Sequence, residues 1–243
     1  MASVTDDFLI DTNEVLYRYT GSAADVRIPA GIFGWIIGAF QNNTRVRRVR
    51  LPEGLTAIGG DTFAGCTALE EVLLPSSIEH ICDRAFQGCT SLRRIGLPPK
   101  LRSIGRAAFA GCTALDGIML PAGTEEIGDA AFQGCTAMQL IDLPIGISQI
   151  GARAFAGCTA LRCVMLPEAV TQIGEETFAG CTSLAELVLP PHADSFGRNA
   201  FAGTPWLAAR YMRSPLLVLC GIVVDGKRCT GAVTVPEGVT AIG

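Results

Sequence analysis

The sequence predicts an elongated β-solenoid, in which short parallel strands of successive coils stack along one axis. Phenylalanine recurs every 23 residues, and proline and cysteine recur with the same step. Three periodic series in one register indicate a tandem-repeat architecture, and they define eight coils over residues 28–211. The series are Phe40, Phe63, Phe86, Phe109, Phe132, Phe155, Phe178 and Phe201; Pro29, Pro52, Pro75, Pro98, Pro121, Pro144, Pro167 and Pro190; and Cys66, Cys89, Cys112, Cys135, Cys158 and Cys181.

Composition excludes several classes of protein. Of the 243 residues, 49% are apolar and 17% charged, which is too apolar for a disordered chain. A net charge of −4 gives no overall attraction to nucleic acid or to an anionic membrane. No apolar run reaches the roughly 18 residues of a membrane span. The acidic start, residues 1–14, does not resemble a signal peptide. We therefore expect a cytoplasmic protein, or a cell-surface or secreted one if a leader has been removed.

Each coil follows one pattern, which residues 92–112 illustrate. Apolar and other residues alternate over 92–97, as expected for a strand with one buried face. Pro98 lacks a backbone donor and ends that strand. Ile104 returns inward on a second short extended stretch, and Gly105 permits the next turn. Phe109 then places its ring in the centre of the coil. A lone coil cannot complete its core or its hydrogen bonds, so stacking is obligatory.

The recurring pattern L-P-x-x-L-x-x-I-G-x-x-A-F-x-x-C-x-x-L-x-x-I covers residues 28–211 and resembles the BspA-like class of leucine-rich repeats. Such repeats occur in bacterial surface proteins and in many other bacterial proteins. The resemblance implies a right-handed, β-rich leucine-rich-repeat solenoid. It implies a parallel sheet on the concave face, with short turns, 3₁₀ segments and short second strands elsewhere. Members are thought to act through protein–protein contacts, some as adhesins for host matrix proteins.

The flanks of the array resemble each other, because residues 15–31 and 223–238 both suggest a strand, a turn and a strand leading into a coil. We expect residues 1–27 to form an N-terminal hairpin cap and 212–234 a hairpin insertion. Asp225-Gly226 is a strong signal for a two-residue hairpin turn. Residues 235–243 restart a coil and stop within it, so we expect a fragment of a longer array.

Coil eight departs from the pattern. Phe196 replaces the usual isoleucine, Thr204 replaces cysteine, and Ala208-Ala209-Arg210 occupies the place of a strand. We therefore expect a weak strand, with a bend or break of the array near Pro205-Trp206.

The six periodic cysteines are expected to be buried free thiols. They occupy one inward turn position, and stacked equivalents have parallel Cβ vectors, which is an unfavourable disulfide geometry. No C-x-x-C pair occurs and no histidine is near, which argues against zinc. Among the others, Cys82 replaces a turn glycine and Cys163 is expected to face outward. Cys220 and Cys229 are expected on one face of the C-terminal hairpin, diagonally placed, so a bond between them is not favoured.

Catalysis finds little support in the sequence. The only histidines are His80 and His192, in different coils. No G-x-S-x-G elbow, phosphate loop or dinucleotide fingerprint occurs. The pairs Glu125-Glu126 and Glu175-Glu176 flank turn glycines and are expected to be solvated. We therefore expect a protein that is not an enzyme and has no cofactor or metal.

Arg45, Arg47, Arg48 and Arg50 form the densest basic cluster, on the strand of the first coil. A contact with nucleic acid or an acidic partner is one interpretation. A charged, solvated end coil is favoured over it, because no aromatic residues interleave the arginines. We expect no nucleic-acid partner and no membrane insertion.

The concave strand face gives the candidate binding site. In L-x-x-I-x-L, the third and fifth positions should point outward, where solvated strands are normally polar. Here they form a mostly apolar row with arginines at one end, and exposed apolar surface usually marks an interface. The alternative is that neighbouring side chains or a dimer cover this row. The expected partner-binding residues are Arg48, Arg50, Leu73, Arg94, Met119, Leu140, Cys163, Met165 and Val188.

The sequence thus favours a non-catalytic module that binds a protein or peptide on its concave sheet. A cell-surface adhesin or spacer array that displays other domains is the alternative. Self-association through the concave face or the open C-terminal end is a further alternative for the partner. An enzyme would need a further domain beyond Gly243.

Overall fold

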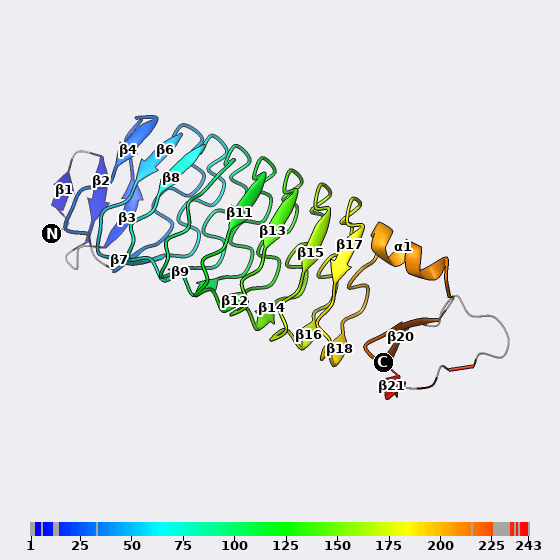
Figure 1. The fold of residues 1–243 in the computed structure, drawn as a ribbon. Helices are drawn as coiled ribbons and strands as arrows, with labels where there is room; N and C mark the ends of the chain where they lie inside the picture. Colours follow the sequence, from blue (N-terminus) through cyan, green and yellow to red (C-terminus); the bar gives the residue numbers. More distant parts are fainter. Residues whose placement is uncertain are drawn as a thin grey trace.

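The computed structural model describes residues 3–5, 7–11, 15–32, 34–214, 216–225, 234–235, 237 and 239–242. Coils stack along one axis from the blue N-terminal end to the orange C-terminal end (Figure 1). Successive coils pair through parallel strands in a constant register, so Val49 lies beside Val72 and Ile118 beside Ile141. This confirms the predicted β-solenoid.

One side of the solenoid is formed by the strands of the L-x-x-I-x-L segments, which we call the first sheet. It consists of two hydrogen-bonded parts, β4-β6-β8 and β11-β13-β15-β17. Between them, Arg94-Ile95-Gly96 does not form a strand. Gly96 weakens strand formation because it has no side chain to pack. The strands are β4 (Asp25–Arg27), β6 (Arg48–Arg50), β8 (Glu71–Leu73), β11 (Gly117–Met119), β13 (Leu140–Asp142), β15 (Cys163–Met165) and β17 (Glu186–Val188).

The opposite side carries the second, shorter strands of the coils, which we call the second sheet (Figure 1). Its strands are also parallel, in the parts β5-β7-β9-β10-β12-β14 and β16-β18. The inward isoleucines Ile58, Ile81 and Ile104 lie in register and are buried. The strands are β5 (Gly34–Ile36), β7 (Leu55–Ile58), β9 (His80–Ile81), β10 (Ser103–Ile104), β12 (Glu126–Ile127), β14 (Gln149–Ile150), β16 (Gln172–Ile173) and β18 (Ser195–Phe196).

The turns that join the second sheet to the first also bind coil to coil, although they contain no strand. The backbone N–H of Phe63 donates to Ala85 O at 2.8 Å, and that of Phe86 donates to Ala108 O at 2.7 Å. The same bond recurs at Phe109, Phe132 and Phe155. Each coil therefore satisfies backbone donors through its neighbour along the whole circumference.

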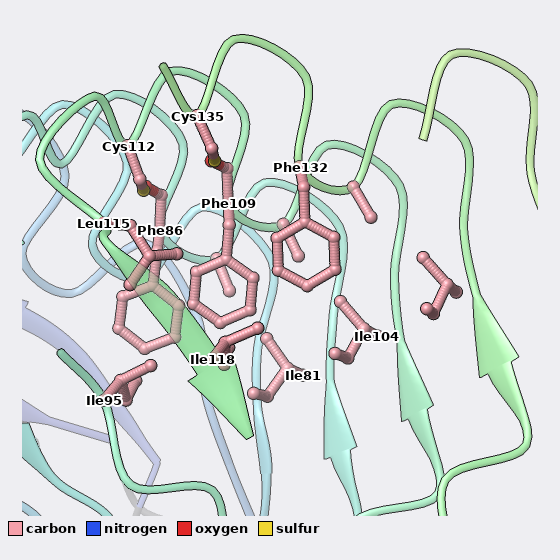
Figure 2. Close-up of a cluster of buried hydrophobic side chains, with 14 of the residues drawn as sticks. Ile81, Phe86, Ile95, Ile104, Phe109, Cys112, Leu115, Ile118, Phe132 and Cys135 are labelled. Atoms are coloured by element: carbon pink, nitrogen blue, oxygen red, sulfur yellow. The ribbon is translucent and has the colours of Figure 1, made fainter. Parts of the chain in front are cut away.

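A stack of phenylalanine rings fills the centre of the solenoid. The rings of Phe86, Phe109 and Phe132 lie nearly parallel between the turns and the isoleucines of the second sheet (Figure 2). The Phe86 and Phe109 centroids are 5.1 Å apart, and the Phe109 and Phe132 planes differ by 1°. Aromatic residues also end the stack, because Tyr19 lies on Phe40 and Trp206 on Phe201. The expected central position of the periodic phenylalanines is confirmed.

The N-terminal end is closed by an antiparallel sheet of β1 (Ser3–Thr5), β2 (Phe8–Ile10) and β3 (Leu16–Tyr19). A hairpin cap was expected over residues 1–27, but β4 in that range pairs in parallel with β6 and thus belongs to the first sheet. The buried side chains of Leu16 and Tyr19 cover the first coil, and Tyr19 N–H donates to Ala39 O at 2.8 Å.

At the other end, helix α1 (Pro205–Tyr211) takes the place of the weak strand expected in coil eight. Thr204, which replaces cysteine, caps the helix by accepting from the backbone N–H of Leu207. Trp206 is buried; its ring lies 4.8 Å from Phe201 and its Nε1 donates to Leu187 O at 2.9 Å. The break expected near Pro205-Trp206 is thus a short capping helix.

A hairpin of β19 (Leu217–Leu219) and β20 (Ile222–Asp225) follows α1, and β21 (Ala241–Ile242) pairs in parallel with β20. Its turn is Cys220-Gly221, where both residues have positive φ. A hairpin insertion was expected over residues 212–234 with its turn at Asp225-Gly226; the described hairpin turns at Cys220-Gly221, and Asp225 is the last residue of β20. Gly226 and Cys229 lie outside the described residues.

The periodic cysteines are buried free thiols, as predicted. Each Sγ–H donates to the carbonyl of the phenylalanine 26 residues earlier, for example Cys112 to Phe86 O at 3.1 Å. Burial raises the pKa of the Cys66, Cys135 and Cys181 thiols to about 12. Cys82 is half-buried, and desolvation raises its pKa to about 11, whereas Cys163 and Cys220 are exposed.

Two turn positions in each coil adopt left-handed backbone geometry. Glycine occupies one of them in most coils, as at Gly111 with φ +72°. The other carries residues with a side chain, including Ala107 at φ 52° and Ala130 at φ 54°. A left-handed residue with a Cβ costs about 1–2 kcal/mol, so this second position holds unfavourable backbone energy.

Replacing Ala107 and Ala130 by glycine should therefore stabilise the protein, by up to about 1 kcal/mol per site. The matched change Gly111→Ala should destabilise it, because it introduces the same conflict. Urea denaturation of the wild type and the two variants provides the measurement. An unchanged or lower midpoint for Ala107→Gly/Ala130→Gly would contradict the assigned backbone geometry.

Alkaline pH should destabilise the fold through the buried thiols. Their pKa is raised from 9.0 to about 12, so an unfolded thiol ionises while the folded one stays neutral. The stabilising contribution is complete below pH 9 and is lost as pH rises toward 12. Each thiol adds a slope of about 1.4 kcal/mol per pH unit in this window. Unfolding free energies should fall less steeply for Cys66→Ala/Cys135→Ala, and equal slopes would refute this assignment.

Thiol labelling should separate the cysteines by position. In a Cys229→Ser background, Cys163 and Cys220 should react with a disulfide reagent in the native state within the mixing phase. Cys82 should react more slowly because desolvation disfavours its thiolate. The six periodic thiols should react only after denaturation. If mass spectrometry shows that Cys112 is modified quickly in the native protein, the predicted burial of the periodic thiols is contradicted.

Candidate functional site

The outer surface of the first sheet, which we call face one, carries the predicted partner-binding residues. Alternation along each strand buries the central residue and exposes its two neighbours, as in Cys163–Met165. Met119 is 82% exposed and Met165 is 69% exposed, although both are large apolar side chains. The apolar stripe consists of the exposed side chains of Leu73, Met119, Leu140, Cys163, Met165 and Val188.

Strand register decides which of these side chains are neighbours. Leu140 lies beside Cys163, and Met165 lies beside Val188, on adjacent strands. Met119 lies in the same row as Met165, with Asp142 between them. The apolar residues are therefore register neighbours from β13 to β17, while Asp142 separates Met119 from Met165. Leu73 is separated from the other stripe residues by the coil that contains Gly96, so the structure does not bring all the predicted residues into one contact surface.

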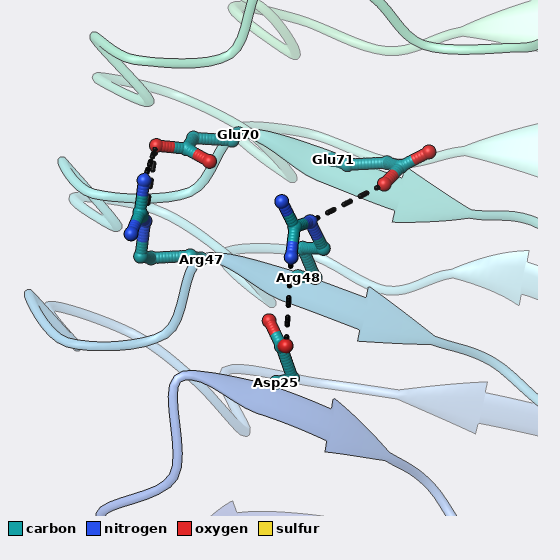
Figure 3. A network of polar contacts seen from close by, with 5 residues as sticks. All are labelled: Asp25, Arg47, Arg48, Glu70 and Glu71. Carbon is teal, nitrogen blue, oxygen red and sulfur yellow. Dashed lines mark hydrogen bonds and ion pairs between the residues drawn. The ribbon is translucent and has the colours of Figure 1, made fainter.

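The N-terminal part of face one is charged, and its ion pairs connect neighbouring coils (Figure 3). Arg47 binds Glu70 at 2.6 Å, and Arg48 reaches Asp25 at 3.5 Å and Glu71 at 3.6 Å. The hydrogen bond from Arg47 lowers the pKa of the Glu70 carboxyl. All are exposed, so each pair contributes little to stability. These pairs tie Arg47 and Arg48 to carboxylates of their own chain.

Arg94 and Arg50 complete the predicted charged residues. Arg94 lies 3.7 Å from Asp116 on the next coil and is highly exposed. Arg50 ends β6 and makes no ion pair within the described part of the chain. The four-arginine cluster of the sequence is thus not one uniform basic patch.

The second sheet brings together a serine and a histidine that the sequence analysis did not connect. His80 Nδ1 lies 2.8 Å from Ser103 Oγ on the adjacent strand. Glu126 follows on the next strand, beyond Ser103, and therefore does not lie beside the imidazole. A hydrolytic triad needs the imidazole between the hydroxyl and the carboxylate. The spacing of 23 residues between His80 and Ser103 was the signal that could have revealed this contact.

A polar hollow of about 740 Å³ lies along the turns after the second sheet. Its carboxylates have structural partners: Asp83 Oδ1 accepts the backbone N–H of Arg106, and Asp129 Oδ1 accepts that of Ala152, both at 2.8 Å. Within the described ranges, no three histidine, cysteine or carboxylate side chains gather as metal ligands. None of the described helices has the length and apolar character needed to cross a membrane.

Comparisons with known proteins agree with this geometry. The BspA type leucine rich repeat region, in six copies, matches residues 13–125 and 104–216. A leucine-rich repeat protein of T. pallidum is 28% identical, with a TM-score of 0.62 over 88% of this chain and 95% of that chain. A leucine-rich cell surface protein of Faecalibacterium prausnitzii is 24% identical, with a TM-score of 0.54 over 85% of this chain and 75% of that one, and shares the fold.

The search of curated proteins found no match. The family match spans most of the chain, from the N-terminal cap to α1 and the residues just after it. The chain belongs to the BspA-type leucine-rich repeat family.

Proposed function

We propose that this protein is a non-catalytic module that binds an extended protein segment along face one. The observation that carries this proposal is the apolar stripe, because a solvated strand face is normally polar. Met119 and Met165 extend from rigid strands into solvent. Methionine side chains adapt their shape to a partner, which suits a contact surface.

The architecture supports a binding role for a second reason. Residues of face one are held at fixed spacing by the strand register, so little ordering is needed when a partner binds. The buried residues between them, such as Ile141 and Val164, fix each strand to the core. The exposed side chains can therefore be substituted without disturbing packing.

A surface adhesin or spacer that displays other domains is the second candidate. The unbroken aromatic stack from Phe8 to Trp206 favours it, because a continuous core gives a stiff rod. A spacer would tolerate substitutions anywhere on face one, whereas a binding module would not.

Met119→Glu/Met165→Glu should abolish binding while leaving the fold intact, because it places charge at the centre of the stripe. The control is Ile145→Glu, which places charge on a 90% exposed apolar residue in the turn after β13, outside the strands of face one. Arrays of random twelve-residue peptides and of host matrix proteins provide the probes.

Wild type and Ile145→Glu should bind the same ligands with the same affinity. The double variant should bind them at least about tenfold more weakly, a loss of about 1.4 kcal/mol in binding free energy. Thermal unfolding of the three proteins should agree within about 2 °C, as expected for surface substitutions. If all three proteins bind the ligands equally, the binding site does not lie on the stripe, and the spacer function is favoured.

A further inference from the structure

Two arginines at the N-terminal end of face one lie side by side. Arg27 ends β4 and Arg50 ends β6, and the two are register partners on parallel strands. Equivalent positions on adjacent strands are about 4.8 Å apart, and both side chains leave the same face of the sheet. Like charges in this arrangement repel each other. Both side chains are exposed, so a third group can approach them together.

The carboxylates near Arg27 and Arg50 form no ion pair with either arginine. Asp25 and Glu71 bind Arg48 from either side, as Figure 3 shows. Glu53 borders the same region but makes no ion pair with either arginine. Among the described residues, Arg27 and Arg50 therefore lack an ion-pair partner.

Two hollows meet at this pair. One, of about 260 Å³, is lined by Arg27 and Arg50 together with Val26, Val49 and Leu73. The other, of about 500 Å³, shares the two arginines and Leu73 and adds further apolar walls at the coil turn. The guanidinium groups are thus bordered by apolar surface on the side that leads toward the stripe. A ligand that fits here combines one anionic group with an adjoining apolar group.

We propose that Arg27 and Arg50 form a carboxylate-binding subsite that anchors an acidic residue of an extended peptide whose apolar residues continue over Leu73 toward Met119. This proposal rests on the proposed function, because the same peptide occupies the apolar stripe. Arginine binds a carboxylate through paired, charge-assisted hydrogen bonds.

Charge favours a single carboxylate over a polyanion. Asp25, Glu53 and Glu71 line the same two hollows, and they would repel a phosphate chain that extends beyond the two arginines. The net charge of −4 adds to this repulsion. A peptide with one acidic residue and apolar neighbours matches both the pair and its surroundings.

The repeat geometry also gives a spacing. Met119 lies three coil steps beyond Arg50, or about 14 Å away at the strand separation of a parallel sheet. An extended chain advances about 3.3 Å per residue, so the acidic residue should lie about four residues from the apolar residue that meets Met119. Peptides with this interval should bind more tightly than those with the same residues at an interval of two.

The test uses an array of random twelve-residue peptides and four forms of the full chain. These are wild type, Arg27→Gln/Arg50→Gln, the stripe variant Met119→Glu/Met165→Glu, and Arg102→Gln/Arg106→Gln. The last removes the same charge from exposed residues next to β10, off face one. Wild-type binders should be enriched in aspartate or glutamate at the predicted interval. Their affinity should fall about tenfold or more with Arg27→Gln/Arg50→Gln, as loss of charge-assisted hydrogen bonds predicts, and stay unchanged with the control.

The outcomes separate the two proposals. If the stripe variant loses binding but the peptides bound by wild type show no preference for acidic residues, the carboxylate subsite alone is overturned. The same conclusion follows if Arg27→Gln/Arg50→Gln prefers acidic residues as strongly as wild type does. An equal loss with the control variant assigns the preference to net charge and also overturns it. If a single-stranded oligonucleotide binds more tightly than the peptides and needs Arg27 and Arg50, the occupant is a nucleic acid. If the protein forms a dimer that Arg27→Gln/Arg50→Gln dissociates, the occupant is a second copy of the chain. Either result refutes the proposal of a peptide ligand. Peptide binding unaffected by the stripe variant overturns the proposed function itself.

Discussion

The backbone register between coils is the constraint on which the rest of this structure depends. A coil of 23 residues contains the partners for only part of its backbone groups, so its neighbours must supply the rest on both sheets and in the turns. Any shift of register would also separate stacked rings such as those of Phe109 and Phe132. It would break the hydrogen bonds that the cysteine thiols donate to phenylalanine carbonyls. Hydrogen bonding and core packing therefore require the same repeat length.

This constraint makes the two ends of the array a special problem, because a terminal coil has a neighbour on one side only. The protein closes both ends with aromatic side chains on non-repeat elements. Tyr19 from the antiparallel N-terminal sheet covers Phe40, and Trp206 from α1 covers Phe201. The helix bears Arg210 over the Trp206 ring at 3.5 Å from its centre, which shields the indole from solvent. The departures of coil eight from the repeat are thus what the end of a stack requires.

The same register organises the surface into rows, since equivalent residues of successive coils lie side by side. Opposite charges in one row form ion pairs, as between Arg48 and Glu71, while apolar residues in a row create continuous apolar surface. Function in such a fold depends on which residue types follow each other at intervals of 23 rather than on a local motif. The repulsive neighbours Arg27 and Arg50 are the clearest example, because neither the charge of the chain nor its local sequence draws attention to Arg27.

The sequence by itself determined the solenoid, the central phenylalanine stack, the buried thiols and the outward direction of residues such as Met119, because strict periodicity and strand alternation leave one solution. It also located the irregularity of coil eight. Only the tertiary structure decided that this irregularity is a helix that buries Trp206, that Gly96 interrupts the first sheet, and that Cys220 lies in a turn. It also revealed the contact of His80 with Ser103 and the partners of each arginine. These features depend on which side chains of different coils meet in space, and end effects and ion pairing have no periodic signature in the chain.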